Sequence, residues 1–238
     1  MIGILGGMGT RAGLDFCNKL AVINRGKIDQ KYPMFMLYNK SKIPNRIKNL
    51  KKYKNVLKSL IAGCRLLQKN KCKFIVMPCN TAHYWHKDIQ KHIKIPILSM
   101  PKEVFLHAKK TCKNNSKIGI LCTEATLETK VYNKYFDKNF SLISPSKSIQ
   151  KKSVNKAINL VKMGKVKDAE RALKPAVNYL LKKNCKKIIL GCTEIPIAIF
   201  AYKSFKKVKE SKIFIDPNLL LAEAVSYTHL TLPTTSSV

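Results

Sequence analysis

Acidic residues and arginines are scarce in this chain of 238 residues. It has 13 Asp and Glu against 46 Lys and Arg, and only five of those cations are Arg. Nucleic-acid sites usually gather arginine in one patch, because Arg binds phosphates and bases with two hydrogen bonds. Here the lysines are scattered through every segment, so the net charge of +33 favours a solvated lysine coat. A lysine-rich nucleic-acid-binding protein stays an alternative function, and otherwise we expect only weak, non-specific nucleic-acid binding at low salt.

Long apolar runs and closely spaced cysteine pairs are also absent. No stretch approaches the roughly 20 apolar residues that span a bilayer, and the start, MIGILGG, lacks the basic region of a secretion signal. The eight cysteines include no C-x-x-C pair, so neither a zinc site nor a disulfide framework is indicated. We expect a cytoplasmic protein with free thiols, no metal and no membrane partner.

Short apolar segments alternate with helical patterns along the chain. The predicted strands are 2–5, 34–38, 74–77, 95–98, 117–121, 140–143, 186–190 and 213–215, and the predicted helices include 53–68, 125–136, 154–162 and 167–182. Short, continuously apolar strands between helices are typical of parallel sheets that helices cover on both faces. The predicted fold class is therefore α/β.

Three segments recur at a nearly constant spacing. IGILGGMGT is echoed by IGILCTEAT, FIVMPCNTA by KIILGCTEI, and IPILSM by KIFIDP. Such a repeat indicates two similar domains related by a pseudo-two-fold axis. We expect residues 1–100 to form the first domain and 101–207 the second, with 208–225 rejoining the first and the strand 213–215 crossing back to it.

The last 13 residues differ in composition from the rest of the chain. Residues 226–238 contain no Asp, Glu, Lys or Arg, although a quarter of the whole chain is charged. The apolar pattern NLLLAEAV predicts a helix that ends near Val225. We therefore expect 226–238 to be a non-native or disordered tail.

Cys79 and Cys192 hold matching positions in the second echo, each just after a predicted strand. Ligands of open parallel sheets bind beyond the carboxyl ends of the strands, so two facing domains would present both thiols across one cleft. A helix N-terminus behind each cysteine would lower the pKa of its thiol towards neutrality. Two thiols about 7 Å apart suit inversion at carbon, because one removes a proton and the other delivers one to the opposite face. His83, four residues beyond Cys79, is either a base partner of that thiol or a helix-capping residue.

These motifs resemble the aspartate/glutamate racemases that work without pyridoxal phosphate. The resemblance runs from IGILGGMG through PCNTAHYW and IGILCTEAT to ILGCTEIP and DPNLLLAEA, and GCTE is similar to the aspartate racemase branch. It implies a site between two α/β domains, no cofactor, a homodimer and a small anionic amino-acid substrate. The implied reaction interconverts L- and D-aspartate, or glutamate, with Cys79 and Cys192 as acid and base. A related isomerase or decarboxylase of the same superfamily is the alternative.

The resemblance also implies roles for residues around the two thiols. Arg46 and Lys162 would bind the distal carboxylate of the substrate, and Met8 would lie on the floor of the site. The residues implied to hold the α-carboxylate and the amino group are Asn80, Thr81, Thr123, Thr126 and Thr193. Glu194, two residues after the second thiol, can hydrogen-bond a ligand or cap the following helix.

The first loop, GGMGTRAG, departs from the family pattern at Thr10 and Gly13 and adds a cation, Arg11. Its segment GMGTRA also fits a loose dinucleotide-binding pattern, but Asn39 stands where that pattern expects an acidic ribose ligand. We therefore expect these glycines to allow a carboxylate to approach the backbone closely at a helix start.

Overall fold

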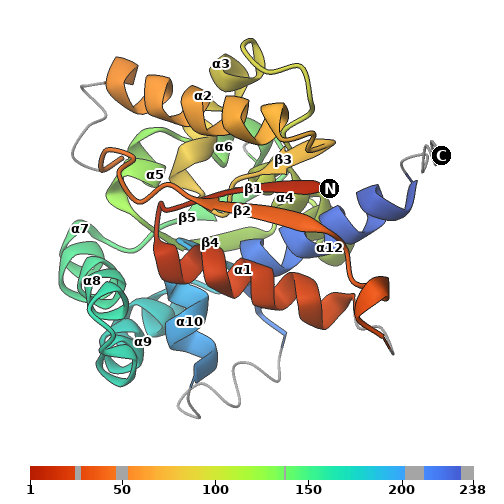
Figure 1. The fold of residues 1–238 in the computed structure, drawn as a ribbon. Helices are drawn as coiled ribbons and strands as arrows, with labels where there is room; N and C mark the ends of the chain where they lie inside the picture. The colour runs from red at the N-terminus through yellow and green to blue at the C-terminus, as the bar shows by residue number, and fades with distance from the viewer. Residues whose placement is uncertain (25–27, 47–52, 137, 202–211, 232–238) are drawn as a thin grey trace.

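The computed structural model describes residues 1–24, 28–46, 53–136, 138–201 and 212–231. Their strands form two parallel sheets (Figure 1). The first sheet has the order β2-β1-β3, with β1 at Ile2–Gly6, β2 at Phe35–Asn39 and β3 at Phe74–Val76. The second has the order β5-β4-β6-β7, with β4 at Lys117–Cys122, β5 at Ser141–Ile143, β6 at Lys187–Gly191 and β7 at Phe214–Ile215.

Both sheets use one strand order. In each, the first strand along the chain lies between the second and the third. The segment around Ile97 then joins β3 by a single parallel bridge to Ile75, just as β7 joins β6. The predicted α/β class is confirmed, and the shared order is what an internal duplication would produce.

The expected crossing of the last strand is wrong. β7 pairs with β6, so it stays in the second sheet. This pairing agrees with the third echo of the repeat. IPILSM contains Ile97, which bridges to β3, and KIFIDP contains β7, which pairs with β6. Of the segment expected to rejoin the first domain, residues 208–211 lie outside the described part of the chain.

Eleven α-helices and three other helical segments accompany the sheets in the described residues. The helices are α1 (Thr10–Ile23), α2 (Tyr53–Lys69), α3 (His86–Gln90), α4 (Met100–Thr111), α5 (Glu124–Glu128), α6 (Asn133–Phe136), α7 (Lys147–Ile149), α8 (Lys156–Lys162), α9 (Val166–Lys182), α10 (Glu194–Ala201) and α12 (Pro217–Thr231). The 3-10 segments are η1 (Asp29–Lys31) and η2 (Thr81–Trp85), and η3 (Gln150–Asn155) is a π-helical turn that leads into α8.

Helices cover both faces of the first sheet. Side chains alternate between the faces of a strand, and in β1 Leu5 packs with Leu60 of α2 while Ile4 packs with Phe16 of α1 and Leu221 of α12. Figure 1 shows α2 on one side of this sheet and α1 with α12 on the other. The C-terminal helix, rather than the last strand, thus returns to the first sheet.

The predicted helix 125–136 is divided in two. α5 ends at Glu128, Lys130 takes a left-handed conformation with φ 50°, and α6 begins at Asn133. The Thr129 hydroxyl donates to the Ala125 carbonyl at 2.6 Å, and such back-bonding favours a bend at this point. The turn between the two helices carries Tyr132 into the interior, where 2% of it is exposed.

The expected helix end near Val225 is also wrong, because α12 continues to Thr231. Val225 is buried against the first sheet, whereas Ser226 and Thr228 are half-buried and Tyr227 is exposed. The Ser226 hydroxyl donates to Asn24 Oδ1 at 2.7 Å. Residues 232–238 of the predicted tail lie outside the described part of the chain.

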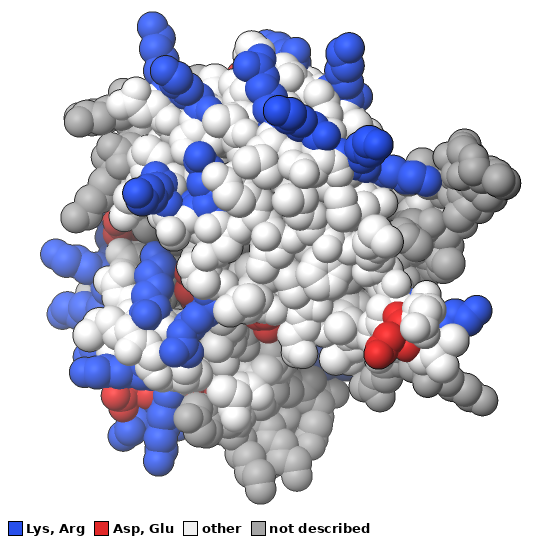
Figure 2. Space-filling view, viewed as in Figure 1, with Lys and Arg blue, Asp and Glu red and all other residues white. Residues whose placement is uncertain are grey.

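Lysine and arginine are spread over the surface rather than gathered in one patch. On the face that Figure 2 shows, they stand near α2 at the top and near α8 and α9 at the lower left, and a broad uncharged area lies between. No helix within the described residues is both long and apolar enough to cross a bilayer.

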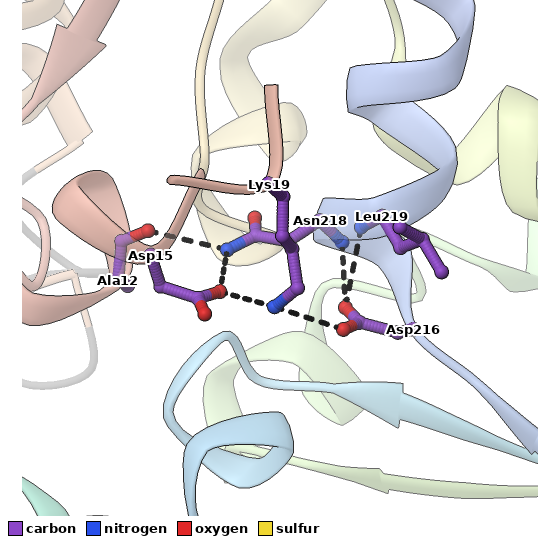
Figure 3. A network of polar contacts seen from close by, with 6 residues as sticks. All are labelled: Ala12, Asp15, Lys19, Asp216, Asn218 and Leu219. Carbon is purple, nitrogen blue, oxygen red and sulfur yellow. Dashed lines mark hydrogen bonds and ion pairs between the residues drawn. The ribbon is translucent and has the colours of Figure 1, made fainter. Parts of the chain in front are cut away.

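A buried polar network joins the start of α12 to α1 (Figure 3). The Lys19 ammonium contacts Asp15 and lies 3.0 Å from Asp216 Oδ2. Asn218 Nδ2 donates to Asp15 Oδ2 at 3.0 Å, and the Asn218 backbone N–H donates to Asp216 Oδ1 at 2.9 Å. Because Asp216 directly follows β7, the network ties the edge of the second sheet to a helix that covers the first.

Candidate active site

One cavity of about 250 Å³ lies beyond the carboxyl ends of strands from both sheets. Cys79 lies three residues after β3, and Cys192 directly follows β6. The cavity is lined by Met8, Ser41, Ile43, Asn45, Arg46, Cys79, Asn80, Thr81, Thr123, Lys162, Cys192, Thr193 and Glu194. Drug-sized ligands occupy roughly 300–1,000 Å³, so this cavity fits a smaller molecule.

Ten of the eleven predicted site residues line this cavity, and Thr126 does not. Its hydroxyl lies 2.8 Å from that of Thr81 and 3.0 Å from that of Thr123. The Thr81 and Thr123 hydroxyls are themselves 3.2 Å apart. The Thr126 hydroxyl therefore holds the Thr81 and Thr123 hydroxyls, whose residues line the cavity. Together the three threonines link the loop after β3 with the loop after β4.

The Cys192 thiol contacts a carboxylate. Its sulfur donates to Glu194 Oε2 at 3.0 Å, and both side chains are buried. Burial raises the pKa of Cys192 well above its ordinary value, and the negative charge and hydrogen bond of Glu194 raise that pKa further. The positive charge of Lys162 opposes this effect more weakly. The lowered pKa expected from a helix N-terminus is thus wrong for Cys192, because desolvation and a neighbouring anion outweigh the dipole of α10.

Gly9, in the loop after β1, gives Glu194 the space that its carboxylate occupies. A Cβ atom on Gly9 would lie 2.4 Å from Glu194 Oε1, closer than any real contact of a Cβ. In the structure the carboxylate that approaches this glycine-rich loop is therefore Glu194, and the approach of a ligand carboxylate to the loop stays a prediction. The same loop places Arg11 against the turn between α8 and α9, where Arg11 Nη2 lies 3.2 Å from the position of a Cβ on Gly164.

His83 supports the backbone next to Cys79. Its Nδ1 lies 2.9 Å from the Cys79 carbonyl oxygen, and its Nε2 accepts from the Met100 backbone N–H at 3.1 Å. Burial lowers the pKa of His83 to about 4, so the ring is neutral and its proton is on Nδ1. Because both ring nitrogens bind backbone groups, His83 holds the loop and does not act as the base partner of the Cys79 thiol.

Two cations line the cavity, one from each half of the chain. Arg46 Nη2 donates to the Met8 carbonyl at 2.5 Å, and Arg46 Nη1 donates to the Pro44 carbonyl at 3.4 Å. The buried Arg46 Nε has no partner among the described residues, so this donor remains for a ligand. Lys162, the last residue of α8, is exposed at the cavity.

A model of the Asp/Glu/Hydantoin racemase family matches residues 5–225. The chain belongs to this family. Its members are isomerases, so the predicted family and enzyme class are confirmed. The match includes both cysteine loops and α12 up to Val225.

Individual members of the family resemble the chain over almost its full length. A broad-specificity amino-acid racemase of Bacillus subtilis is 26% identical, over 97% of this chain and 98% of its own length. The structure of the Picrophilus torridus aspartate racemase superposes with a TM-score of 0.80 at 30% identity, over 96% of this chain and 93% of its own. The glutamate racemase of Francisella tularensis, solved with D-glutamate, shares the fold with a TM-score of 0.68 at 21% identity, over 99% of this chain and 84% of its own.

Sequence reasoning missed several residues of this family member's site. Ser41, Ile43 and Asn45 line the cavity and lie within five residues of Arg46, so their nearness in sequence to a predicted ligand could have indicated them. Tyr132 does not line the cavity, but its hydroxyl donates to Asn80 Oδ1. No sequence signal predicts that contact, because it depends on the break between α5 and α6.

Proposed function

We propose that the chain interconverts L- and D-aspartate without pyridoxal phosphate, with glutamate as the second candidate substrate, by proton transfer between Cys79 and Cys192. The observation that carries this proposal is the presence of both thiols in one small cavity, on loops that follow strands of different sheets. All eight cysteines are free, so neither thiol is held in a disulfide. Free thiols also support our proposal of a cytoplasmic location.

The proton steps follow from the unequal surroundings of the two sulfurs. With Cys192 as a thiol hydrogen-bonded to Glu194, Cys79 as a thiolate removes the α-proton and becomes a thiol. The resulting planar carbanion takes the Cys192 proton on its opposite face, which leaves Cys192 as the thiolate. The reverse reaction starts from that state. To restore the starting state, the Cys79 thiol releases its proton to solvent and the Cys192 thiolate regains one from solvent, with Glu194 as the relay next to Cys192.

Substrate binding in this proposal uses the other lining residues. Arg46 and Lys162 attract the distal carboxylate, and the Arg46 Nε without a partner supports this role. The α-carboxylate and the amino group contact Asn80, Thr81, Thr123 and Thr193, with Thr126 holding two of the hydroxyls, and Met8 shapes the floor. Glu194 is the anionic side chain among the lining residues, and its carboxylate accepts the hydrogen bond of the Cys192 thiol.

Chiral analysis of the products tests this function. The protein is incubated separately with L-aspartate, L-glutamate, L-alanine and L-lysine, and both enantiomers are quantified with time. We expect the fastest racemisation with L-aspartate. Equal rates with all four would instead favour the broad specificity of the Bacillus subtilis relative, and aspartate loss without its D-enantiomer would favour a decarboxylase or another isomerase.

We also propose a homodimer, with a second copy on the face formed by α1 and β2, where few charged side chains are exposed. Leu14 and Val22 on α1 are 55% and 47% exposed, and Met34, just before β2, and Phe35, its first residue, are 69% and 39% exposed. Two copies with a net charge of +33 each repel one another least where lysine is lacking, and Figure 2 shows such an area on the face where these elements lie.

Light scattering measures the assembly directly. We expect a dimer for the intact protein and a monomer for Met34→Lys, while Leu106→Lys, a similar change at an exposed position of α4, leaves the dimer intact. A monomeric intact protein would refute this interface.

A further inference from the structure

A hydrogen bond from Tyr132 links the second half of the chain to the loop that carries Cys79, in addition to the hydroxyl contacts of Thr81 with Thr123 and Thr126. Tyr132 lies in the turn before α6, is buried, and packs its ring edge-to-face against Phe136 with centroids 6.0 Å apart. Its hydroxyl donates to Oδ1 of Asn80, the residue that follows Cys79. The contact spans 52 residues of sequence and joins loops that belong to different sheets.

The other end of the Asn80 amide remains available. Asn80 is 2% exposed and lines the cavity, and its Nδ2 has no hydrogen-bond partner among the described residues. A buried amide donor without an acceptor is unfavourable, so such a group indicates a ligand that accepts from it. The orientation of the amide decides what the cavity presents, because a rotation by 180° would replace the Nδ2 donors with the Oδ1 acceptor.

We propose that Tyr132 is a positioning residue, whose hydroxyl fixes the Asn80 amide so that Nδ2 donates to the α-carboxylate of the substrate. This inference rests on the proposed racemase function and adds a residue to its binding site. Without the phenol, the amide can turn its oxygen towards the cavity, where it would repel a carboxylate. Tyr132 itself does not line the cavity, so it acts through Asn80 alone.

The surroundings of the phenol favour its role as the donor in this contact. Burial raises the pKa of Tyr132 well above its ordinary value, and negative charge on Cys122, Asp216 or Cys192 would raise that pKa further. The hydroxyl therefore keeps its proton whenever Cys192 becomes a thiolate. The donated hydrogen bond, and with it the amide orientation, persists through both halves of the reaction.

The test combines Tyr132→Phe, Asn80→Ala and the double variant in a cycle. Phe keeps the ring contact with Phe136 and removes only the hydroxyl, and melting temperatures confirm folding. Tyr135→Phe is the matched control, because it removes a hydroxyl from the neighbouring turn of the same segment, where Tyr135 lies 3.2 Å from the Ser99 hydroxyl. The dissociation constant for L-aspartate is measured by calorimetry, and KM and kcat by chiral analysis.

We expect Tyr132→Phe to raise both the dissociation constant and KM about tenfold, with kcat within about threefold, as for a lost contact made equally in ground and transition states. Tyr135→Phe should leave all three unchanged. The double variant should bind aspartate no more weakly than Asn80→Ala, because Tyr132 acts only through that amide.

Several results would overturn the inference. One is aspartate binding by Tyr132→Phe that equals that of the intact protein. Another is an additive double variant, or a lower melting temperature with an unchanged dissociation constant, since these indicate a purely structural role. Failure of the proposed reaction is distinguishable: aspartate binding that weakens as expected, without any racemisation by the intact protein, would reject the reaction and retain the positioning role. No aspartate binding by the intact protein would reject both.

Discussion

The two cysteine loops hold equivalent places in the two sheets but provide unequal chemistry. Cys192 donates to the Glu194 carboxylate, which together with burial raises the pKa of that thiol. Cys79 has no hydrogen bond to a carboxylate within the described residues, and its neighbour His83 binds backbone groups and is neutral. Equivalent positions in the two sheets therefore do not have equivalent chemical surroundings. In the proposed reaction, this difference gives Cys192 the role of proton donor when Cys79 removes the first proton.

The duplication is equally asymmetric one element later. Met100 and Asp216 are 116 residues apart, the same spacing as the first echo, and each precedes a proline at the start of a helix. Met100 is an apolar core residue, whereas Asp216 is buried in an ion pair with Lys19. The equivalent position thus contributes to packing in the first half of the chain and to a polar link between the halves in the second.

Removal of either thiol should have the largest effect on activity of the substitutions considered. Cys79→Ser and Cys192→Ser should each reduce racemisation by about 10³-fold or more, because a serine hydroxyl at the same place ionises far less readily than a thiol. Cys112→Ser, at a half-buried cysteine that does not line the cavity, should retain full activity. Chiral product analysis measures the rates, and substantial racemisation by either active-site variant would contradict the two-base scheme.

Loss of the Lys19 ammonium should lower stability by about 3 kcal/mol, since it leaves a buried carboxylate without its cation. Lys19→Met is compared by urea unfolding with Lys91→Met, which removes an exposed ion pair to Asp88 and should change stability by less than about 1 kcal/mol. Equal effects of the two substitutions would show that the link between the halves does not stabilise the fold.

The same variant has a defined pH dependence. Burial raises the pKa of Asp216, and the Lys19 charge opposes that rise. Without Lys19 the folded-state pKa of Asp216 moves further above its unfolded value, so the folded protein binds more protons than the unfolded chain between the two values. Stability then falls as pH rises, and the deficit of Lys19→Met should be small near pH 4 and larger at pH 7. A deficit that is constant with pH would contradict this assignment.

Glu194→Gln makes the two cysteine loops more alike. It removes the charge that raises the pKa of Cys192, so that thiol should ionise at lower pH. Because Cys192 must be protonated to deliver a proton, the alkaline limb of kcat should move to lower pH. At neutral pH burial keeps the thiol protonated, and loss of the carboxylate that relays the Cys192 proton should lower kcat roughly tenfold. Glu128→Gln, at an exposed position of α5, is the control. An unmoved alkaline limb would assign the raised pKa to burial alone.

Arg46→Met should change substrate choice and leave the proton steps intact. It removes the guanidinium whose Nε lacks a partner, so KM for aspartate should rise about tenfold while KM for alanine stays nearly constant. Arg65→Met, at an exposed position of α2, should change neither. A parallel rise for both substrates would show that Arg46 maintains the loop through Met8 and does not select the distal carboxylate.

Much of the fold and of the site could be predicted because repetition and hydrophobic pattern are local signals. All predicted strands except 95–98, which forms a single bridge, and the internal repeat follow from short motifs, and the ten lining residues follow from those motifs together with the family resemblance. The raised pKa of Cys192 could not be predicted, because the direction of the pKa shift depends on burial and on where the Glu194 side chain points. The partnership of Tyr132 with Asn80 and the pairing of β7 depend on contacts between distant segments. The end of α12 was missed because the composition of the tail outweighed its helical pattern.

The most direct measurement is early-time solvent labelling. L-aspartate is incubated with the protein in heavy water, and the remaining L-aspartate and the new D-aspartate are separated and analysed for α-deuterium. Two opposed thiols predict deuterium in nearly all of the D-product and almost none in the recovered L-substrate, because the proton removed on one face is not the one delivered on the other. Similar deuterium in both enantiomers would indicate one base serving both faces and would contradict the account.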